Sequence, residues 1–165
     1  MRSLPFPLHD RLGIPEPTPT LLLLRGLPGA GKTTLARTLL ELTGDRHLVA
    51  MMAADDFFVG DDGVYRFDAS RLSEAHESCR QKTEMAMGMG IPLVIVHNTF
   101  SRNWEMAAYR ELAVENDYRL TVVTVEGDHG SEHAPASVRT GMAARWEAWD
   151  SAVPIPGGSP TRKAS

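Results

Sequence analysis

A loop of eight residues carries the clearest chemical signal in this sequence. It matches G-x-x-x-x-G-K-[ST] at every fixed position and lies between an apolar run and a segment of good helix formers. Glycines in such a loop let backbone N–H groups point at phosphate oxygens, and the following helix start adds partial positive charge. Lys32 is expected to bridge the β- and γ-phosphates of ATP, and the Thr33 hydroxyl to bind Mg²⁺. The residues expected to hold this nucleotide are Gly26, Pro28, Gly29, Ala30, Gly31, Lys32, Thr33 and Thr34.

Two adjacent carboxylates follow the next apolar run of the chain. Asp55 and Asp56 come directly after residues 48–54, where they could face the phosphate loop. Phosphoryl transfer to a hydroxyl uses a carboxylate that accepts the hydroxyl proton. We expect one of the pair to orient the acceptor oxygen, and the other to support Mg²⁺-bound water or cap a turn. Asp55 and Thr33 are the residues we assign to the metal.

A phosphate loop alone does not separate a kinase from a GTPase or a motor. GTPases carry a base-specificity motif such as N-K-x-D, which this sequence lacks, and a motor requires a larger chain than 165 residues. A small chain with one such loop and room for an acceptor pocket favours a P-loop phosphotransferase, an ATP-dependent kinase.

The elements that must position these residues alternate along the chain. Short apolar runs at 21–25, 48–52, 93–96 and 120–125 predict strands, and helical spacing predicts helices at 32–43, 70–89, 103–115 and 137–149, the last with Ser137 as N-cap. This alternation indicates an α/β fold with a mostly parallel sheet of about four to five strands between layers of helices. We expect a three-layer P-loop NTPase of the adenylate-kinase-like type. Residues 57–67, with a glycine-rich turn, are expected to form a small excursion near the strand ends, where ligands bind in such folds.

Composition bounds the organisation of the chain. Residues 1–19, rich in proline, are expected to form an extended arm, 20–150 the kinase domain and 151–165 a frayed tail. A net charge of −4 predicts no general attraction to nucleic acid, so any such contact would be local. The lone Cys79 fits a reducing cytoplasm and a buried structural role. No apolar run is long enough for a membrane span or a secretory signal, and no required protein partner is evident.

The sequence resembles the polynucleotide-kinase-like P-loop family. The likeness begins with the run from Arg25 through Arg37 and continues through the Ala-Asp-Asp-Phe-Phe segment at 54–58, Val-Ile-Val-His-Asn-Thr at 94–99 and Trp-Glu-Met at 104–106. It ends with Met142, Arg145, Trp146 and Glu147, and covers nearly all of 20–150. It is especially similar to small kinase domains of animal ubiquitin-ligase-binding proteins and their phage relatives. The resemblance implies that Asp55 is the general base and that Arg145 belongs to the donor side.

The sequence departs from the family pattern in three places. The family's third strand usually ends with an acceptor-side Asp, and this chain has His97 there. The family's lid carries an Arg that reaches the donor phosphates; here that Arg is missing, and Arg139 and His129 are the candidates to replace it. Phe58 stands where polynucleotide 5′-kinases have an Arg for the acceptor phosphate. We therefore expect the residues that bind ATP to follow the family pattern and the residues that bind the acceptor to differ from it.

The resemblance implies an ATP-dependent kinase of a nucleic-acid or nucleotide hydroxyl. The acceptor could be a polynucleotide 5′-OH or a hydroxymethylated DNA base, as in some phage enzymes. A small-metabolite kinase and a nucleotide-binding module without transfer are the alternatives. Aromatic residues could stack a base and arginines could hold an acceptor phosphate. The expected acceptor-side residues are Asp55, Asp56, Phe57, Phe58, Tyr65, Arg66, Arg71, His97 and Asn98, and the expected catalytic residues are Asp55, Lys32, His97 and Arg139.

Overall fold

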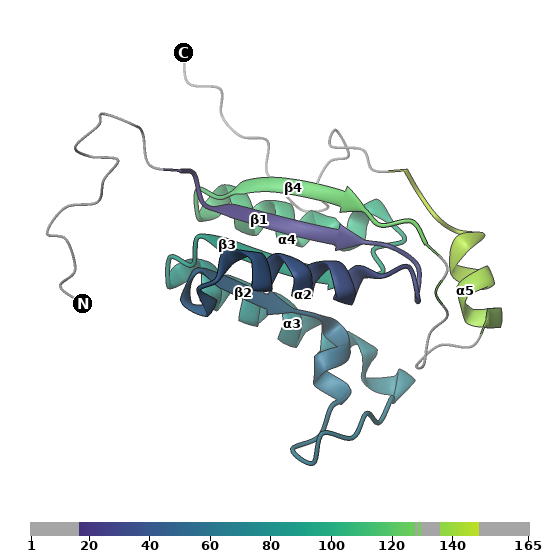
Figure 1. Cartoon of the computed structure of the whole chain (residues 1–165). Coiled ribbons are helices and arrows are strands. Elements are labelled where there is room, and N and C mark those ends of the chain that lie inside the picture. Colours follow the sequence, from purple (N-terminus) through teal and green to yellow (C-terminus); the bar gives the residue numbers. More distant parts are fainter. Residues whose placement is uncertain (1–16, 128, 130–135, 149–165) are drawn as a thin grey trace, which may run out of the picture.

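Four parallel strands form the centre of the molecule (Figure 1). The computed structural model describes residues 17–127, 129 and 136–148, so most of the expected arm and all of the expected tail lie outside the described residues. The strand order is β2-β3-β1-β4, and every pair is parallel, as the alternation of apolar runs predicted. The strands are β1 (Thr20–Arg25), β2 (Val49–Met52), β3 (Leu93–Asn98) and β4 (Arg119–Thr124).

The two central strands end at the same edge of the sheet. Leu24 of β1 is in register with His97 of β3, and Arg25 is in register with Asn98. The predicted third strand stopped two residues too early because His97 and Asn98 are polar and broke its apolar pattern. Both side chains are nevertheless buried, so polar groups belong to the interior at this edge.

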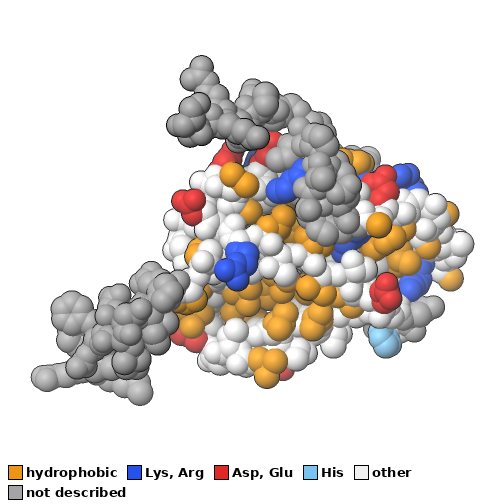
Figure 2. All heavy atoms as spheres, turned by 90° about the horizontal axis from the view of Figure 1, so that it is seen from above, with side chains coloured by type: hydrophobic (Ala, Val, Ile, Leu, Met, Phe, Trp, Pro, Cys, Tyr) orange, Lys and Arg blue, Asp and Glu red, His pale blue; other side chains and the backbone are white. Residues whose placement is uncertain are grey.

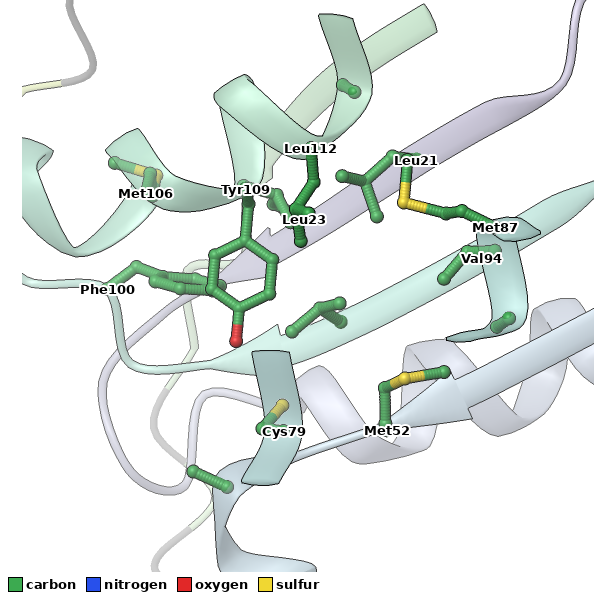
Figure 3. Packing of buried hydrophobic residues seen from close by; sticks show 14 of the residues in the cluster. Leu21, Leu23, Met52, Cys79, Met87, Val94, Phe100, Met106, Tyr109 and Leu112 are labelled. Atoms are coloured by element: carbon green, nitrogen blue, oxygen red, sulfur yellow. The ribbon is translucent and has the colours of Figure 1, made fainter. Parts of the chain in front are cut away.

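Helices cover both faces of the sheet, as expected for three layers. On one face α2 (Lys32–Thr43) packs with Ala36 against Leu24 and Ile95. On the other face α3 (Leu72–Gly88) and α4 (Asn103–Glu115) enclose the larger core, which Figure 3 shows closing around Leu23, Tyr109 and Cys79. Cys79 is buried there, which confirms its expected structural place.

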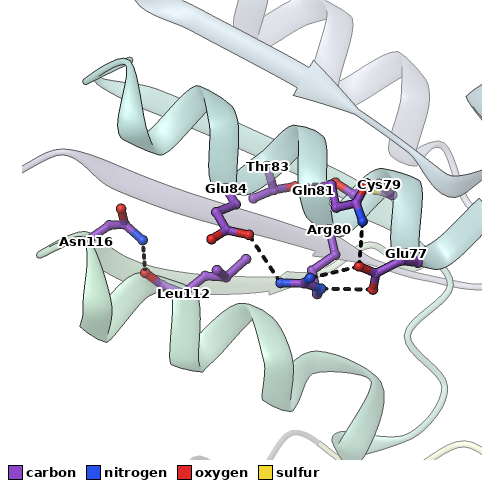
Figure 4. A network of polar contacts seen from close by, with 8 residues as sticks. All are labelled: Glu77, Cys79, Arg80, Gln81, Thr83, Glu84, Leu112 and Asn116. Atoms are coloured by element: carbon purple, nitrogen blue, oxygen red, sulfur yellow. Dashed lines mark hydrogen bonds and ion pairs between the residues drawn. The ribbon is translucent and has the colours of Figure 1, made fainter.

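The outer surface of α3 carries a charged network. Arg80 forms ion pairs with Glu77 and Glu84, and Glu77 also accepts a hydrogen bond from Gln81 (Figure 4). These side chains are substantially exposed, so each pair contributes no more than about 1 kcal/mol. The helix is therefore held mainly by its buried face.

The expected excursion is a small hairpin beyond β2. A 3₁₀ turn (Ala54–Phe58) leads into an isolated antiparallel bridge between Val59 and Tyr65. Phe58 is buried and makes edge-to-face contacts with Phe57, Tyr65 and Phe67. A second 3₁₀ turn, Ala69–Arg71, returns the chain to α3. Figure 1 places this excursion near the carboxyl ends of the strands.

The last described helix, α5, is shorter than predicted. It spans Ala136–Ala143, with Ser137 inside its first turn and not at the N-cap. Beyond the helix, Glu147 binds other elements: its N–H donates to Ser101 O at 2.9 Å, and Arg25 Nη2 donates to its carbonyl at 2.6 Å. Trp149, the expected end of the helix, lies outside the described residues.

Strand β4 is an edge of the sheet. It pairs with β1, and within the described ranges no strand pairs with its other side. Figure 2 looks from above in Figure 1, the side on which β4 lies, and shows hydrophobic side chains scattered among charged ones. Among the described helices, none has the length and apolar character that crossing a bilayer requires.

Candidate functional site

The loop after β1 has the backbone that phosphate binding requires. Gly29 and Gly31 have φ values of +79° and +101°, which side chains rarely adopt. A Cβ on Gly26 would lie 2.6 Å from the carbonyl oxygen of Val125. The loop therefore closes tightly between β1 and the start of α2, and its cradle fits the phosphates of a nucleotide.

The Lys32 side chain lies over this loop, and its pKa is lowered. Its Nζ donates hydrogen bonds to Gly26 O at 2.7 Å and to Leu27 O at 3.0 Å. Burial lowers the pKa of Lys32 to about 8; the charge of Asp55 opposes this shift and that of Arg139 adds to it. Both charged groups thus act on the residue expected to bridge the phosphates.

The lowered pKa of Lys32 predicts a pH dependence of nucleotide binding. The free protein loses the lysine proton above about pH 8, whereas bound phosphates favour the charged form and raise the pKa in the complex. The Kd for ADP should therefore rise by up to about tenfold for each pH unit above 8, with little change between pH 6 and 7. Calorimetry at pH 9 in two buffers of different ionisation enthalpy should show proton uptake on binding, and its absence would contradict this assignment.

The two adjacent carboxylates have different neighbours. Asp56 Oδ2 accepts a hydrogen bond from Ala53 N at 2.9 Å and so caps the 3₁₀ turn. Asp55 Oδ1 lies 3.4 Å from the Tyr65 hydroxyl, and Asp55 is exposed. Burial, together with the charge of Asp55, raises the pKa of Tyr65 to about 12, so Tyr65 stays protonated. Both carboxylates are exposed, but it is the charge of Asp55 that acts on Lys32.

His97 lies beside the phosphate loop and not only beside the carboxylates. Its Nδ1 is 3.4 Å from Thr33 Oγ1, a contact that the sequence did not predict. Burial lowers the pKa of His97, and the charge of Asp56 partly opposes the shift. The ring is thus held neutral at neutral pH, and it contacts the residue expected to bind the metal.

Two of the expected acceptor-side residues are part of the interior. Asn98 Oδ1 accepts from Ala54 N at 2.8 Å, and its Nδ2 lies 3.7 Å from Cys79 Sγ. This amide fixes β3 to the turn that carries Asp55. Phe58 is 6% exposed and forms the centre of the aromatic cluster in the excursion. Both side chains are therefore used in packing and hydrogen bonding within the protein, next to the expected acceptor site.

The remaining acceptor-side candidates lie on the outside of the excursion. Arg66 is paired with Asp62, and Arg71 is paired with Glu74 while its guanidinium stacks on Phe57 at 4.6 Å. The aromatic residues that a base could reach are Phe57, which is partly buried, and Tyr65 beside Asp55. The two arginines are thus committed to carboxylates of the chain itself.

Both candidates for the missing lid cation are brought to the phosphate loop. Arg139 Nη2 donates to Gly127 O at 2.6 Å, and its charge acts on Lys32. His129 N donates to Gly29 O at 2.9 Å, and its ring lies within 4 Å of the position of a Cβ on Gly31. The sequence did not single out Gly127. A Cβ there would lie 2.7 Å from Ala30 O, so only glycine lets this segment pack so closely against the phosphate loop. Arg145 follows α5 with an exposed side chain.

A buried arginine ties the C-terminal described segment to the base of the loop. Arg25 is fully buried, with its guanidinium 4.1 Å from the Trp146 ring centroid and Nη2 donating to Glu147 O. The Glu147 carboxylate accepts from Arg102 Nη1 at 2.8 Å and Asn103 N at 2.9 Å, at the start of α4. We call these contacts the Arg25 clamp. Sequence resemblance singled out Trp146 and Glu147 but gave no partner for them.

The clamp should contribute strongly to stability. Arg25→Ala should lower the free energy of unfolding by about 3 kcal/mol, because it removes a buried cation–π contact and a hydrogen bond and leaves a cavity. The matched control is Arg102→Ala, whose ion pair with Glu147 is partly exposed and should contribute about 1 kcal/mol or less. Urea unfolding measures both variants, and equal losses would show that the clamp is an ordinary surface contact.

The loop geometry also bears on a metal ion. Within the parts of the chain that the structure describes, no three His, Cys, Asp or Glu side chains cluster so as to hold an ion by themselves. A magnesium site of the kind found in kinases takes few protein ligands and completes its shell with phosphates and water. For such a shared site we expect Thr33 and Asp55 as protein ligands, with the nucleotide supplying the remaining ones.

A parallel sheet with this loop between its first strand and helix defines a P-loop kinase-like domain. The chain belongs to the AAA domain family (AAA_33), whose model matches residues 21–134. NEDD4-binding protein 2 from Homo sapiens is 40% identical over 100 residues, which are 61% of this chain and 5% of that protein. The 2′,3′-cyclic-nucleotide 3′-phosphodiesterase from Pongo abelii is 28% identical over 127 residues, 73% of this chain and 28% of that protein. The chain thus spans a small part of these relatives.

Solved structures share the fold. A chain of the Pnkp1/Rnl/Hen1 RNA repair complex superposes with a TM-score of 0.61 at 17% identity, covering 79% of this chain and 45% of that chain. Kti12 from Chaetomium thermophilum in complex with ADP-AlF3 gives 0.59 at 18% identity, covering 78% and 80%. These likenesses confirm the P-loop kinase-like architecture.

Proposed function

We propose that this chain is an ATP-dependent kinase that transfers the γ-phosphate to a hydroxyl of a nucleotide or nucleic acid. The observation that carries the proposal is that Lys32 and Asp55 follow the carboxyl ends of strands of one parallel sheet. Lys32 lies on the loop after β1, Asp55 lies after β2, and the charge of Asp55 acts directly on Lys32. A donor-side cation and an exposed carboxylate thus lie at the same edge of the sheet, where in-line transfer needs them.

The proposed mechanism assigns one task to each group. Backbone N–H groups of the loop and Lys32 hold the β- and γ-phosphates, and Arg139 adds positive charge from the lid side. Mg²⁺ bound with the nucleotide would neutralise phosphate charge, and Thr33 and Asp55 are residues that would hold it. Asp55 accepts the acceptor's hydroxyl proton as the new oxygen–phosphorus bond forms and the bond from the γ-phosphorus to ADP breaks. The proton then passes to solvent.

The aromatic side chains beside Asp55 support a base-containing acceptor. Tyr65 contacts Asp55, and Phe57 lies on the same excursion with Arg71 stacked on its ring. A nucleobase could stack on such a surface next to the accepting carboxylate. The names of two similar proteins, a cyclic-nucleotide phosphodiesterase and a component of an RNA repair complex, point toward the same chemistry.

A small-molecule acceptor is the second candidate, and the pairing of the arginines favours it. Arg66 and Arg71, expected to hold an acceptor phosphate, are each paired with a carboxylate of the chain, Arg66 with Asp62 of the excursion and Arg71 with Glu74 of α3. The formal net charge of −4 also opposes tracking of a long phosphate backbone. A metabolite or nucleoside needs neither feature.

Labelling experiments test the proposal and separate its versions. The protein should be incubated with γ-labelled ATP, Mg²⁺ and a panel of DNA, RNA, hydroxymethylated DNA, nucleosides and sugars. We expect label to enter an acceptor that carries a base. Label in a sugar alone would favour the small-metabolite kinase. ATP binding without hydrolysis or transfer to any acceptor would identify a nucleotide-binding module and overturn the kinase proposal.

A further inference from the structure

The position of the His97 imidazole beside the phosphate loop has a consequence for the choice of metal. His97 is 8% exposed, and its Nδ1 is the ring nitrogen that faces Thr33 Oγ1, 3.4 Å away. Thr33 is the loop residue that we assign to the cation of the nucleotide complex. The imidazole and hydroxyl come from β3 and α2, so the packing of α2 on the sheet fixes their separation.

The distance between these two atoms suits neighbouring ligands of one ion. Two ligands at right angles around an octahedral ion, with bonds of about 2.1 Å, are separated by about 3 Å. The observed 3.4 Å therefore requires only a small adjustment for both atoms to bind the same cation. Negative charge lies close by, since the carboxylates of Asp55 and Asp56 act on the His97 ring against the charges of Lys32 and Arg37.

We propose that His97 Nδ1 binds the divalent cation of the nucleotide complex together with Thr33, and that this site therefore favours Mn²⁺ and Co²⁺ over Mg²⁺. Mg²⁺ prefers oxygen ligands, whereas the affinity of sites containing nitrogen rises from Mn²⁺ to Co²⁺. The inference rests on the nucleotide site of the proposed function but not on transfer to any acceptor. It gives His97 a donor-side role in addition to the acceptor-side role that its position in the sequence suggested.

Nucleotide affinity with different metals tests the preference without any turnover. Calorimetry would measure the Kd for ADP in Mg²⁺, Mn²⁺ and Co²⁺, with the wild type, His97→Asp and His97→Ala. We expect the wild type to bind ADP about tenfold more tightly with Co²⁺ than with Mg²⁺, and His97→Asp to reduce this preference to about threefold or less. An unchanged metal preference in both variants would overturn the inference.

Pulsed EPR of bound Mn²⁺·ADP gives a direct readout of the ligand. We expect nitrogen coupling in the wild type and its loss in His97→Asp. The matched control is His129→Ala, because the His129 ring also lies near Gly31 of the loop; the nitrogen coupling should survive in this variant. If the nitrogen coupling persists in His97→Asp, or never appears with Mn²⁺·ADP bound, this inference is overturned but the proposed function is not. Failure to bind ADP with any metal would overturn the proposed function as well.

Discussion

Asp55→Asn should lower kcat by roughly 10²–10⁴-fold while the protein still binds ADP, because the amide keeps the shape of the side chain but cannot accept the hydroxyl proton. Both carboxylates are exposed, but Asp55 contacts Tyr65 and its charge acts on Lys32, whereas Asp56 accepts a hydrogen bond from the backbone N–H of Ala53. The measurement is steady-state transfer to the acceptor found by labelling, together with the Kd for ADP. A variant with near-normal kcat would remove Asp55 from the role of general base.

Asp56→Asn is the matched control for this carboxylate. An asparagine oxygen can still accept the hydrogen bond from Ala53 N, so the turn should persist and kcat should fall by less than about tenfold. If Asp56→Asn is the more damaging change, the assignment within the pair is reversed. Asp55→Asn should also lower the pKa of Lys32 further, since the Asp55 charge opposes the effect of burial. The pH above which ADP binding weakens should then move below 8.

Lys32→Ala should abolish measurable phosphoryl transfer and weaken nucleotide binding, because it removes the cation that bridges the phosphates. The loss in kcat/KM should be at least about 10³-fold, or about 4 kcal/mol of transition-state stabilisation. Nucleotide affinity and transfer would be measured together at pH 7, where Lys32 is charged in the free protein.

Lys82→Ala serves as the control for removing a lysine. Lys82 is exposed on α3, away from the loop, and its loss changes the net charge by the same amount. Its transfer rate and affinity for ADP should match those of the wild type. Normal turnover by Lys32→Ala would contradict the kinase proposal for every acceptor.

Local patterns were enough to predict the elements that carry the donor site. The helices at 32–43 and 103–115 have the predicted bounds, and the phosphate loop lies between β1 and α2 as its motif required. Such features depend on backbone conformations and apolar periods of neighbouring residues, which the sequence displays directly. The parallel sheet and the family also agree with the expected class of fold.

Contacts between distant segments could not be predicted in this way. The family resemblance implied that Asp55 is the base, but only the structure shows that Asp55 contacts Tyr65 while Asp56 accepts a hydrogen bond from Ala53 N. His97 appeared to lie beyond its strand, but the packing of α2 on the sheet brings it to Thr33.

The sequence by itself determined the donor loop, the layered α/β fold and the acid pair. Tertiary structure alone decided that Arg25 is buried under Trp146 and that Arg139 acts on Lys32 across more than a hundred positions. The physical reason is that the loop forms through local backbone geometry. The charge, burial and partners of each site residue depend instead on side chains that meet only when the helices pack on the sheet.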